Sequence, residues 1–202
     1  MTIYIDDREV DIEAEDLDAV LQTATESLQN DETGRIVVEV QIDGHALGGD
    51  EIEKRRSESV SESEIRLYSS HPRDVALSVL EGVAAALNDA SAAQAKAAEL
   101  LQQDDASKAL VELGPAIEIW QQVQQAVLQS SLLLNVDLNS IEFDGKSFAV
   151  LEEALKQQLT QFIEALRAQD TVALADALAY EWPETITHWQ RFIELLIEHV
   201  ED

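Results

Sequence analysis

The chain of 202 residues contains no cysteine. This absence excludes disulfides, thiolate metal sites and thiol nucleophiles together, and it is compatible with a reducing compartment. The sequence also lacks the HExxH, Walker, GxGxxG and GxSxG patterns of common metal, nucleotide and hydrolase sites. Its four histidines form no i, i+4 pair. The sequence therefore predicts no catalytic residue, no metal site and no cofactor, and hence a protein that is not an enzyme.

Basic residues are scarce, with 13 Lys and Arg against 41 Asp and Glu, and the net charge is −28. The acidity is spread along the chain, because residues 1–70 hold 19 acidic and 6 basic residues and the remainder holds 22 and 7. Such a field repels nucleic-acid phosphate and anionic lipid, so we expect no nucleic-acid and no membrane partner. Two explanations stay open: a basic protein partner, or adaptation to a salty cytoplasm.

Long apolar runs are also missing, since no window approaches 18 uninterrupted apolar residues. The first residues, Met1 to Asp7, lack the basic start and apolar run of a signal peptide. These features predict a cytoplasmic protein without a membrane span.

Residues 1–70 are predicted to form a small α+β domain with a β-grasp-like ββαββ order. Alternating apolar residues predict strands within residues 2–12, 35–42 and 65–68. Apolar residues at helical spacing, from Leu17 to Leu28, predict one helix between them. The longest strand is expected to place four residues on one side: Ile36, Val38, Val40 and Ile42.

A connection rich in serine and acidic residues, residues 48–64, precedes the last predicted strand. If a serine here were phosphorylated, Arg55 and Arg56 could pair with the phosphate, which would make the segment a docking loop. The simpler interpretation is a solvated connection without a role.

Residues 71–202 are predicted to form an antiparallel four-helix bundle made of two similar helical hairpins. One stretch occurs twice, from Asp104 to Gln121 and from Asp170 to Gln190, and both copies carry Asp, Ala-Leu, Pro and Trp-Gln in that order. The aspartates are expected to cap helices. The prolines, Pro115 and Pro183, are expected to kink or restart them.

Each predicted helix has an apolar face. The first helix is expected to bury Val75, Val79, Val83, Ala86, Ala90, Ala93, Ala97 and Leu100, and the second to bury Leu110, Leu113, Ile117, Trp120, Val123 and Val127. The last two faces run through Phe148, Leu151, Leu155, Leu159, Phe162 and Leu166, and through Leu174, Leu178, Trp182, Ile186, Trp189, Ile193, Leu196 and Val200.

Three tryptophans, Trp120, Trp182 and Trp189, lie on these faces and are expected in the core. An alternative is that they line a partner-binding cleft where the kinked helices diverge. His188, beside Trp189, is a candidate ligand or base, although an exposed helix histidine is the simpler interpretation.

Several segments taken together resemble an uncharacterised family of acidic bacterial proteins that join a small β-rich domain to a helical body. The segments are residues 3–6, 40–44, 71–77, 143–147 and 173–181. The resemblance implies no activity and carries an association with motility genes.

The predicted function is that of a cytosolic interaction protein, a chaperone or adaptor for a basic or amphipathic segment in a motility or export system. The edge of residues 35–42, or a cleft near Trp182 and Trp189, would receive the partner. The alternative is a small-molecule-responsive sensor with its ligand in the helical bundle. A DNA mimic is a further variant, and the sequence leaves the oligomeric state open.

Overall fold

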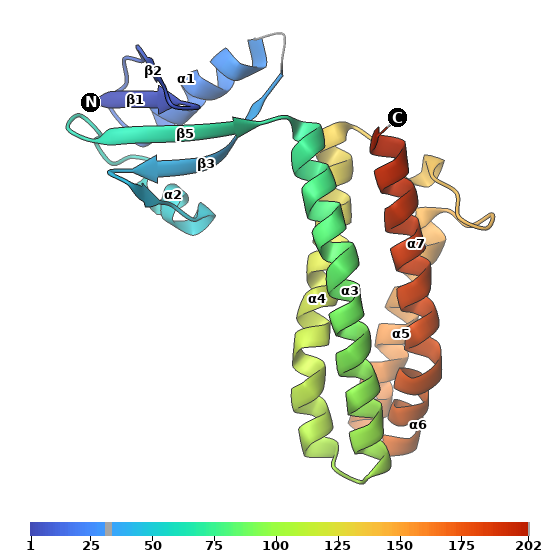
Figure 1. The fold of residues 1–202 in the computed structure, drawn as a ribbon. Coiled ribbons are helices and arrows are strands. Elements are labelled where there is room, and N and C mark those ends of the chain that lie inside the picture. The colour runs from blue at the N-terminus through green and yellow to red at the C-terminus, as the bar shows by residue number, and fades with distance from the viewer. Residues whose placement is uncertain (31–33, 202) are drawn as a thin grey trace. The chain divides into compact units, whose positions relative to one another are not determined.

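The computed structural model describes residues 1–30 and 34–201. The chain divides into two compact units, Met1–Val75 and Ala76–Asp202. The first unit holds a small sheet with two helices, and the second is a helical body (Figure 1). The fold is therefore mixed α and β.

The sheet of the first unit has the strand order β2-β1-β5-β3-β4. Strands β1 and β5 are parallel, and the other neighbours are antiparallel. Helix α1 buries its predicted face, including Leu17, Val20 and Ala24, against the apolar side of the sheet. The elements are β1 (Thr2–Ile5), β2 (Arg8–Val10), α1 (Leu17–Asn30), β3 (Ile36–Ile42), β4 (His45–Ala46), α2 (Gly49–Arg55) and β5 (Glu64–Ser70).

Two short elements of this unit were not predicted, strand β4 and helix α2. One predicted face was also wrong, because Val38 is 48% exposed while Val40 and Ile42 are buried. The register of β3 against β5 shifts between Val37 and Glu39. A bulge of this kind inserts one residue into the alternation, so side chains before it change faces.

Asp6 joins the ends of three strands of the sheet. Its carboxylate accepts hydrogen bonds from the backbone N–H (2.8 Å) and hydroxyl (2.6 Å) of Ser69, and it lies 3.7 Å from a guanidinium nitrogen of Arg35. Desolvation raises the pKa of Asp6, but the Ser69 hydrogen bonds and the charges of Arg35 and Arg8 outweigh it, so the pKa lies below 3.8. The charged form of Asp6 therefore stabilises this unit.

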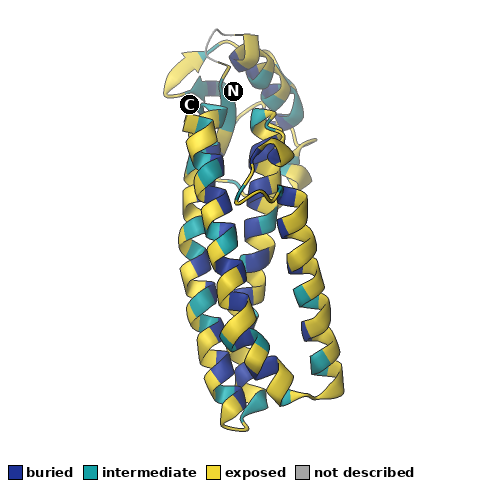
Figure 2. Cartoon of the chain, turned by 90° about the vertical axis from the view of Figure 1, so that its right-hand side faces the viewer, coloured by how far each residue is buried: buried dark blue, intermediate teal, exposed yellow. Residues whose placement is uncertain are grey.

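The helical body begins with two long antiparallel helices joined by a short turn, and α5 and α7 lie beside them (Figure 1). Buried residues lie on the inward sides of the helices and exposed residues on the outward sides (Figure 2). The elements are α3 (Pro72–Gln102), α4 (Ala106–Leu134), the 3-10 helix η1 (Leu138–Ser140), α5 (Phe148–Ala168), α6 (Thr171–Asp176), the π-helical turn η2 (Ala177–Glu181) and α7 (Trp182–Glu201).

The aspartates that cap helices in the two copies of the repeated stretch are Asp105 and Asp170. Asp105 caps α4 by accepting the backbone N–H of Lys108 at 3.3 Å, and Asp170 caps α6 in the same way with Ala173 at 3.0 Å. Asp104 instead adopts a left-handed backbone conformation with φ of 60°. The predicted cap at Asp104 was therefore one residue too early.

The two prolines of the repeated stretch have different surroundings. Helix α4 continues through Pro115 without a break, so the predicted option of a restarted helix was wrong there. Pro183 is the second residue of α7, which directly follows the π turn η2, and a single kinked helix had been predicted there. A proline lacks the N–H and crowds the preceding turn, and a widened turn relieves this crowding.

The buried face of α3 was predicted only in part, because Ala90 and Ala97 are buried as predicted but other predicted residues are not. Val79, predicted to be buried, is 41% exposed, and the polar Gln94 is 2% exposed. The buried residues are Ala76, Leu80, Leu87, Ala90, Gln94, Ala97, Ala98 and Leu101. In α4 the predicted core residues Leu110 and Ile117 are each 49% exposed. Smaller residues, Ala109 and Ala116, face the core instead.

By length and composition alone, α3 would also be long and apolar enough to cross a membrane, with a mean hydropathy of 1.2 over an 18-residue window of which 22% is buried. Its buried leucines, Leu80 and Leu87, belong to the same apolar cluster as residues of α4, α5 and α7. A core helix of a bundle has these properties as well, so this single helix is weak evidence for a membrane span.

Candidate functional site

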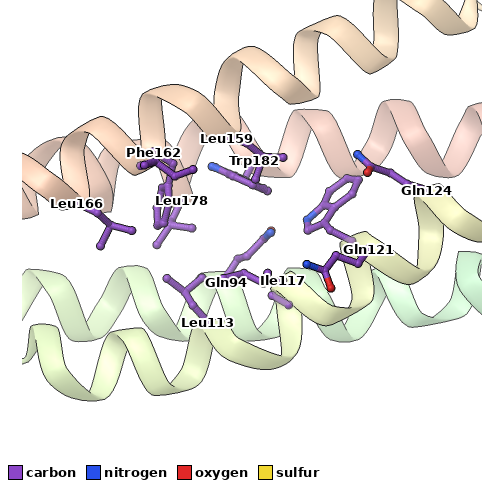
Figure 3. Close-up of a pocket in the computed structure, with 13 residues that line it drawn as sticks. Gln94, Leu113, Ile117, Gln121, Gln124, Leu159, Phe162, Leu166, Leu178 and Trp182 are labelled. Atoms are coloured by element: carbon purple, nitrogen blue, oxygen red, sulfur yellow. The ribbon is translucent and has the colours of Figure 1, made fainter.

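A cavity of about 210 Å³ lies inside the helical body. Its walls come from α3, α4, α5, η2 and α7, and Gln94 and Trp182 reach into the space between the two pairs of helices (Figure 3). The lining residues are Gln94, Leu113, Ala116, Ile117, Trp120, Gln121, Gln124, Leu159, Phe162, Ile163, Leu166, Leu178 and Trp182.

Three polar atoms of this lining are buried without a hydrogen-bond partner among the described residues. They are Oε1 of Gln94 and the indole nitrogens of Trp120 and Trp182. The three residues are only 2%, 4% and 4% exposed. An unpaired buried polar group costs about 1–3 kcal/mol, and native proteins hold few of them. A fourth such atom, the indole nitrogen of Trp189, lies outside the lining. The cavity is the candidate functional site because small-molecule sites are typically well-formed, mostly apolar cavities of this kind.

The tryptophans form one aromatic cluster with two roles. Trp120 meets Trp182 edge to face at 5.9 Å between ring centroids, and it meets Trp189 at 5.8 Å. Trp189 is fully buried and also contacts Phe148, but it does not line the cavity. Trp189 is therefore a core residue, as expected. Trp120 and Trp182 are buried, as expected for core residues, and they also line the cavity.

The entrance of the cavity lies between α4 and α5. The most exposed apolar lining residues, Ile117 on α4 and Ile163 on α5, are 49% and 46% exposed. Gln121 and Gln124 of α4 line the same space and are exposed or half-buried. Deeper residues such as Leu178 are fully buried. A ligand would pass the two isoleucines and meet Gln94 and the indoles inside.

The cavity offers no group for acid, base or nucleophilic chemistry. None of its lining residues is Asp, Glu, His, Lys, Arg, Ser or Tyr, and its polar groups are three amides and two indoles. Catalysis of proton transfer or acyl transfer needs a titratable or nucleophilic side chain at the reacting atom. This arrangement can bind and orient a molecule.

A family model matches residues 78–192, more than half of the chain. The chain belongs to this family, described as Domain of unknown function (DUF8042). The DUF8042 region contains every residue that lines the cavity. A search of curated proteins and a search of solved structures gave no match.

His188 lies in the DUF8042 region but outside the cavity lining. Its side chain is 26% exposed, and its Nε2 lies 3.8 Å from a carboxylate oxygen of Glu184 on the preceding turn. Its ring lies 5.5 Å from that of Phe143. The structure thus places His188 away from Gln94 and the two cavity tryptophans. Among residues 1–30 and 34–201, no three His, Asp or Glu side chains gather where they could hold a metal ion.

Arg55 and Arg56 lie outside the DUF8042 region, in the sheet unit. Arg55 pairs with Glu58 at 2.7 Å, and Arg56 pairs with Asp18 at 2.9 Å and Glu53 at 2.8 Å. The backbone carbonyl of Arg56 also accepts the N–H of Asp18 at the start of α1. Both guanidinium groups thus already have carboxylate partners.

Gln94 is the site residue that the sequence analysis missed. The predicted face of α3 followed the valines and alanines and did not include this polar residue. A signal was present, because Ala76, Leu80, Val83, Leu87, Ala90, Gln94, Ala97 and Leu101 are spaced 4, 3, 4, 3, 4, 3 and 4. This heptad spacing is typical of a helix packed in a bundle, and it places Gln94 at a core position.

Proposed function

We propose that this protein is a non-enzymatic binding protein whose helical body takes up a small, mostly apolar molecule in its cavity. The observation that carries the proposal is the cavity of about 210 Å³ itself, because eight of its thirteen lining residues are Leu, Ile, Ala or Phe. Binding would stabilise the helical body, and such a change is the basis of a ligand-responsive sensor.

The size of the cavity supports a ligand of about the size of one aromatic ring. Apolar cavities of about 150 Å³ bind benzene, and this one is larger at about 210 Å³. Removing apolar ligand surface from water is the favourable contribution that such a wall offers.

Thermal unfolding of the full chain with and without toluene tests the proposal. A ligand at about 100 times its dissociation constant adds about 2.7 kcal/mol to the stability of the native state, so the melting temperature should rise. Ala116→Leu fills the cavity from its wall and should abolish the rise. Ala92→Leu makes the same change at an exposed site on α3 and should retain it. An equal response of both variants would contradict binding in this cavity.

A second candidate, a protein-partner adaptor, is favoured by the apolar residues exposed on α4. Val111 is 75% exposed and Leu132 is 79% exposed. Four others on this helix are at least 39% exposed: Leu110, Ile117, Leu128 and Leu133. With a net charge of −28, the complementary partner is a basic amphipathic helix.

Titration with a synthetic Leu/Lys amphipathic helix tests this second function. Leu132→Ser should weaken binding about tenfold, and Val172→Ser, at a 69% exposed site on α6, should leave it unchanged. Equal affinity of both variants would argue against an α4 surface. Sedimentation velocity of the protein without the peptide shows whether the α4 surface instead binds a second copy of the chain.

The finer architecture is part of the proposal. The central parallel pair β1 and β5, with α1 on one side of the sheet, supports a β-grasp-like unit. Descent of α3–α4 and α5–α7 from one helical hairpin is tested by superposing the two pairs.

Cytoplasmic location and a role in motility or export stay predictions that gene neighbourhood tests. Adaptation to salt predicts stability that rises steeply with NaCl concentration.

A further inference from the structure

We infer that the cavity ligand is an uncharged straight-chain amphiphile, of the class of a medium-chain alcohol, that lies along the helices with its polar end at Gln121 and Gln124. This inference rests on the proposed function and adds the chemical class of the ligand. The first basis is the shape of the cavity. On α5 the lining runs from Leu159 to Leu166, and at a rise of about 1.5 Å per residue these positions lie about 10 Å apart. On α4 it runs from Leu113 to Gln124, about 16 Å along the helix.

Volume and length together favour a chain over a ring. Apolar cavities of about 150 Å³ hold benzene with its six carbon atoms, so about 210 Å³ holds about eight non-hydrogen atoms. Eight atoms in an unbranched chain extend along the lining, whereas a ring of similar size leaves part of its length empty. Wall residues beside an empty stretch lose their van der Waals contacts. The extended shape therefore fits this space better.

The two ends of the cavity differ in polarity. Figure 3 shows Gln121 and Gln124 at one end and Leu166 and Leu178 toward the other. Gln121 is exposed and Gln124 is half-buried, so a ligand can reach this end. The two glutamines are three residues apart on α4, a spacing that makes side chains neighbours on a helix. An amide both donates and accepts hydrogen bonds, so this pair suits a hydroxyl group, which also does both.

The polar end of the ligand should carry no charge. The described lining contains no Lys or Arg to pair with a carboxylate, and the net charge of −28 opposes the approach of an anion. It contains no Asp or Glu either, so a strongly hydrated ammonium group would lose water beside the half-buried Gln124 without gaining a carboxylate partner. A hydroxyl group needs no counter-charge there, while its chain leaves water for the apolar end.

Titration of the full chain with three alcohols of seven carbons tests the shape: 1-heptanol, 4-heptanol and cyclohexylmethanol. 1-Heptanol should bind about tenfold more tightly than either of the others, because a central hydroxyl or a ring keeps methylenes from the apolar end. From 1-butanol to 1-heptanol the affinity should rise about fourfold per added methylene. If 4-heptanol or cyclohexylmethanol bound as tightly as 1-heptanol, the inference would be overturned while the proposed function stood. Failure of every probe, toluene included, would overturn the proposed function itself.

Head-group probes and a double variant test the polar end. Heptanoate and 1-heptylamine should bind more weakly than 1-heptanol, and tighter binding of either would overturn an uncharged ligand. Gln121→Leu combined with Gln124→Leu should lower the ratio of the affinities for 1-heptanol and 1-chloroheptane about threefold, because the hydroxyl loses its partners. Gln122→Leu combined with Gln125→Leu, at exposed positions of the same helix outside the lining, is the matched control. Equal ratios in the two double variants would overturn the placement of the hydroxyl.

A substitution at the apolar end tests the direction of the chain. Leu166→Phe enlarges a half-buried lining residue, so the gain in affinity per methylene should end at a shorter alcohol than in the wild type. Gln161→Phe, at an exposed position of α5 outside the lining, should leave the limit unchanged. The same limit in both variants would show that the chain does not extend toward Leu166 and would overturn the inferred orientation.

Discussion

The two units of this chain satisfy their polar groups in different ways. In the sheet unit, ion pairs join separate elements, for example Arg56 with Asp18 and Arg66 with Asp7. In the helical body, ion pairs run along single helices, for example between Arg191 and Glu194 on α7 and between Lys96 and Glu99 on α3. Every unpaired buried side-chain polar atom found among the described residues lies in the helical body.

The difference indicates where the chain keeps capacity for binding. The sheet unit uses its polar groups for its own stability, since Asp6, Arg35 and Ser69 bond one another. The helical body instead holds four buried side-chain atoms without a partner among the described residues, and they are Gln94 Oε1 and the indole nitrogens of Trp120, Trp182 and Trp189. Substitutions in each unit should therefore have effects of different kinds.

The largest effect is expected in the packed core of the helical body. Trp189→Ala removes a fully buried ring and should destabilise the protein by about 3–5 kcal/mol. Urea denaturation followed by circular dichroism measures the change. Tyr180→Ala, at a 72% exposed site, is the control and should stay within about 0.5 kcal/mol. A stable Trp189→Ala variant that had only lost ligand binding would contradict the distinction between core and cavity tryptophans.

The next effect should have the opposite sign. Gln94→Leu replaces an unpaired buried amide by an apolar group of similar size, and we expect it to stabilise the ligand-free protein by about 1–3 kcal/mol. Chemical denaturation without added ligand measures this gain. A loss of stability would show that the amide has a partner, and the comparison between the two units would fail.

In the sheet unit, Asp6→Asn should destabilise by about 1–2 kcal/mol at pH 7, after allowance for solvent screening. The pKa of Asp6 is lowered by folding, so its stabilising effect is complete above the unfolded value near 3.8 and is lost as the pH falls through the folded value. The difference between wild type and variant should therefore be constant above about pH 5 and shrink below pH 3.8. A difference independent of pH would show that the charge of Asp6 does not matter.

The smallest effect is expected from the ion pairs along single helices. Arg191→Ala removes contacts with Glu194 and Glu198 on an exposed face of α7 and should leave the urea midpoint almost unchanged. High salt should remove even this difference, because the pair is solvent-exposed. A loss of stability as large as that of Asp6→Asn would show that local pairs in the body matter as much as the contacts between elements in the sheet unit.

The buried faces of helices were predicted correctly where the spacing of the apolar residues fits only one face. The faces of α1 and α5 were confirmed, because Leu17, Val20, Leu151 and Leu155 are all buried. In β3 the simple alternation misplaced Val38, since a bulge has no clear signature in a single sequence. Strand β4 and helix α2 are short, and their residues carry little periodic pattern.

The candidate site was predicted only in part. The cavity tryptophans were identified from their residue type and position, but Gln94 was not, because polar residues were assumed to avoid the core. The π turn also left an overlooked signal. Leu174, Leu178, Trp182 and Ile186 are all buried at successive spacings of four. In a regular α-helix each such step overshoots a full turn by about 40°, so three in a row favour a widened turn.

The π turn η2 acts as a phase correction between two stretches of helix. In a regular α-helix, with about 100° per residue, the twelve steps from Leu174 to Ile186 would leave the two side chains about 120° apart, whereas both are buried. Removing one residue from Ala177–Glu181 would let the segment close into a regular α-helix, in which eleven steps, or about 1,100°, keep both side chains on the core face. A single-residue deletion should therefore be tolerated in this segment, whereas a deletion of two residues should turn Leu174 out of the core.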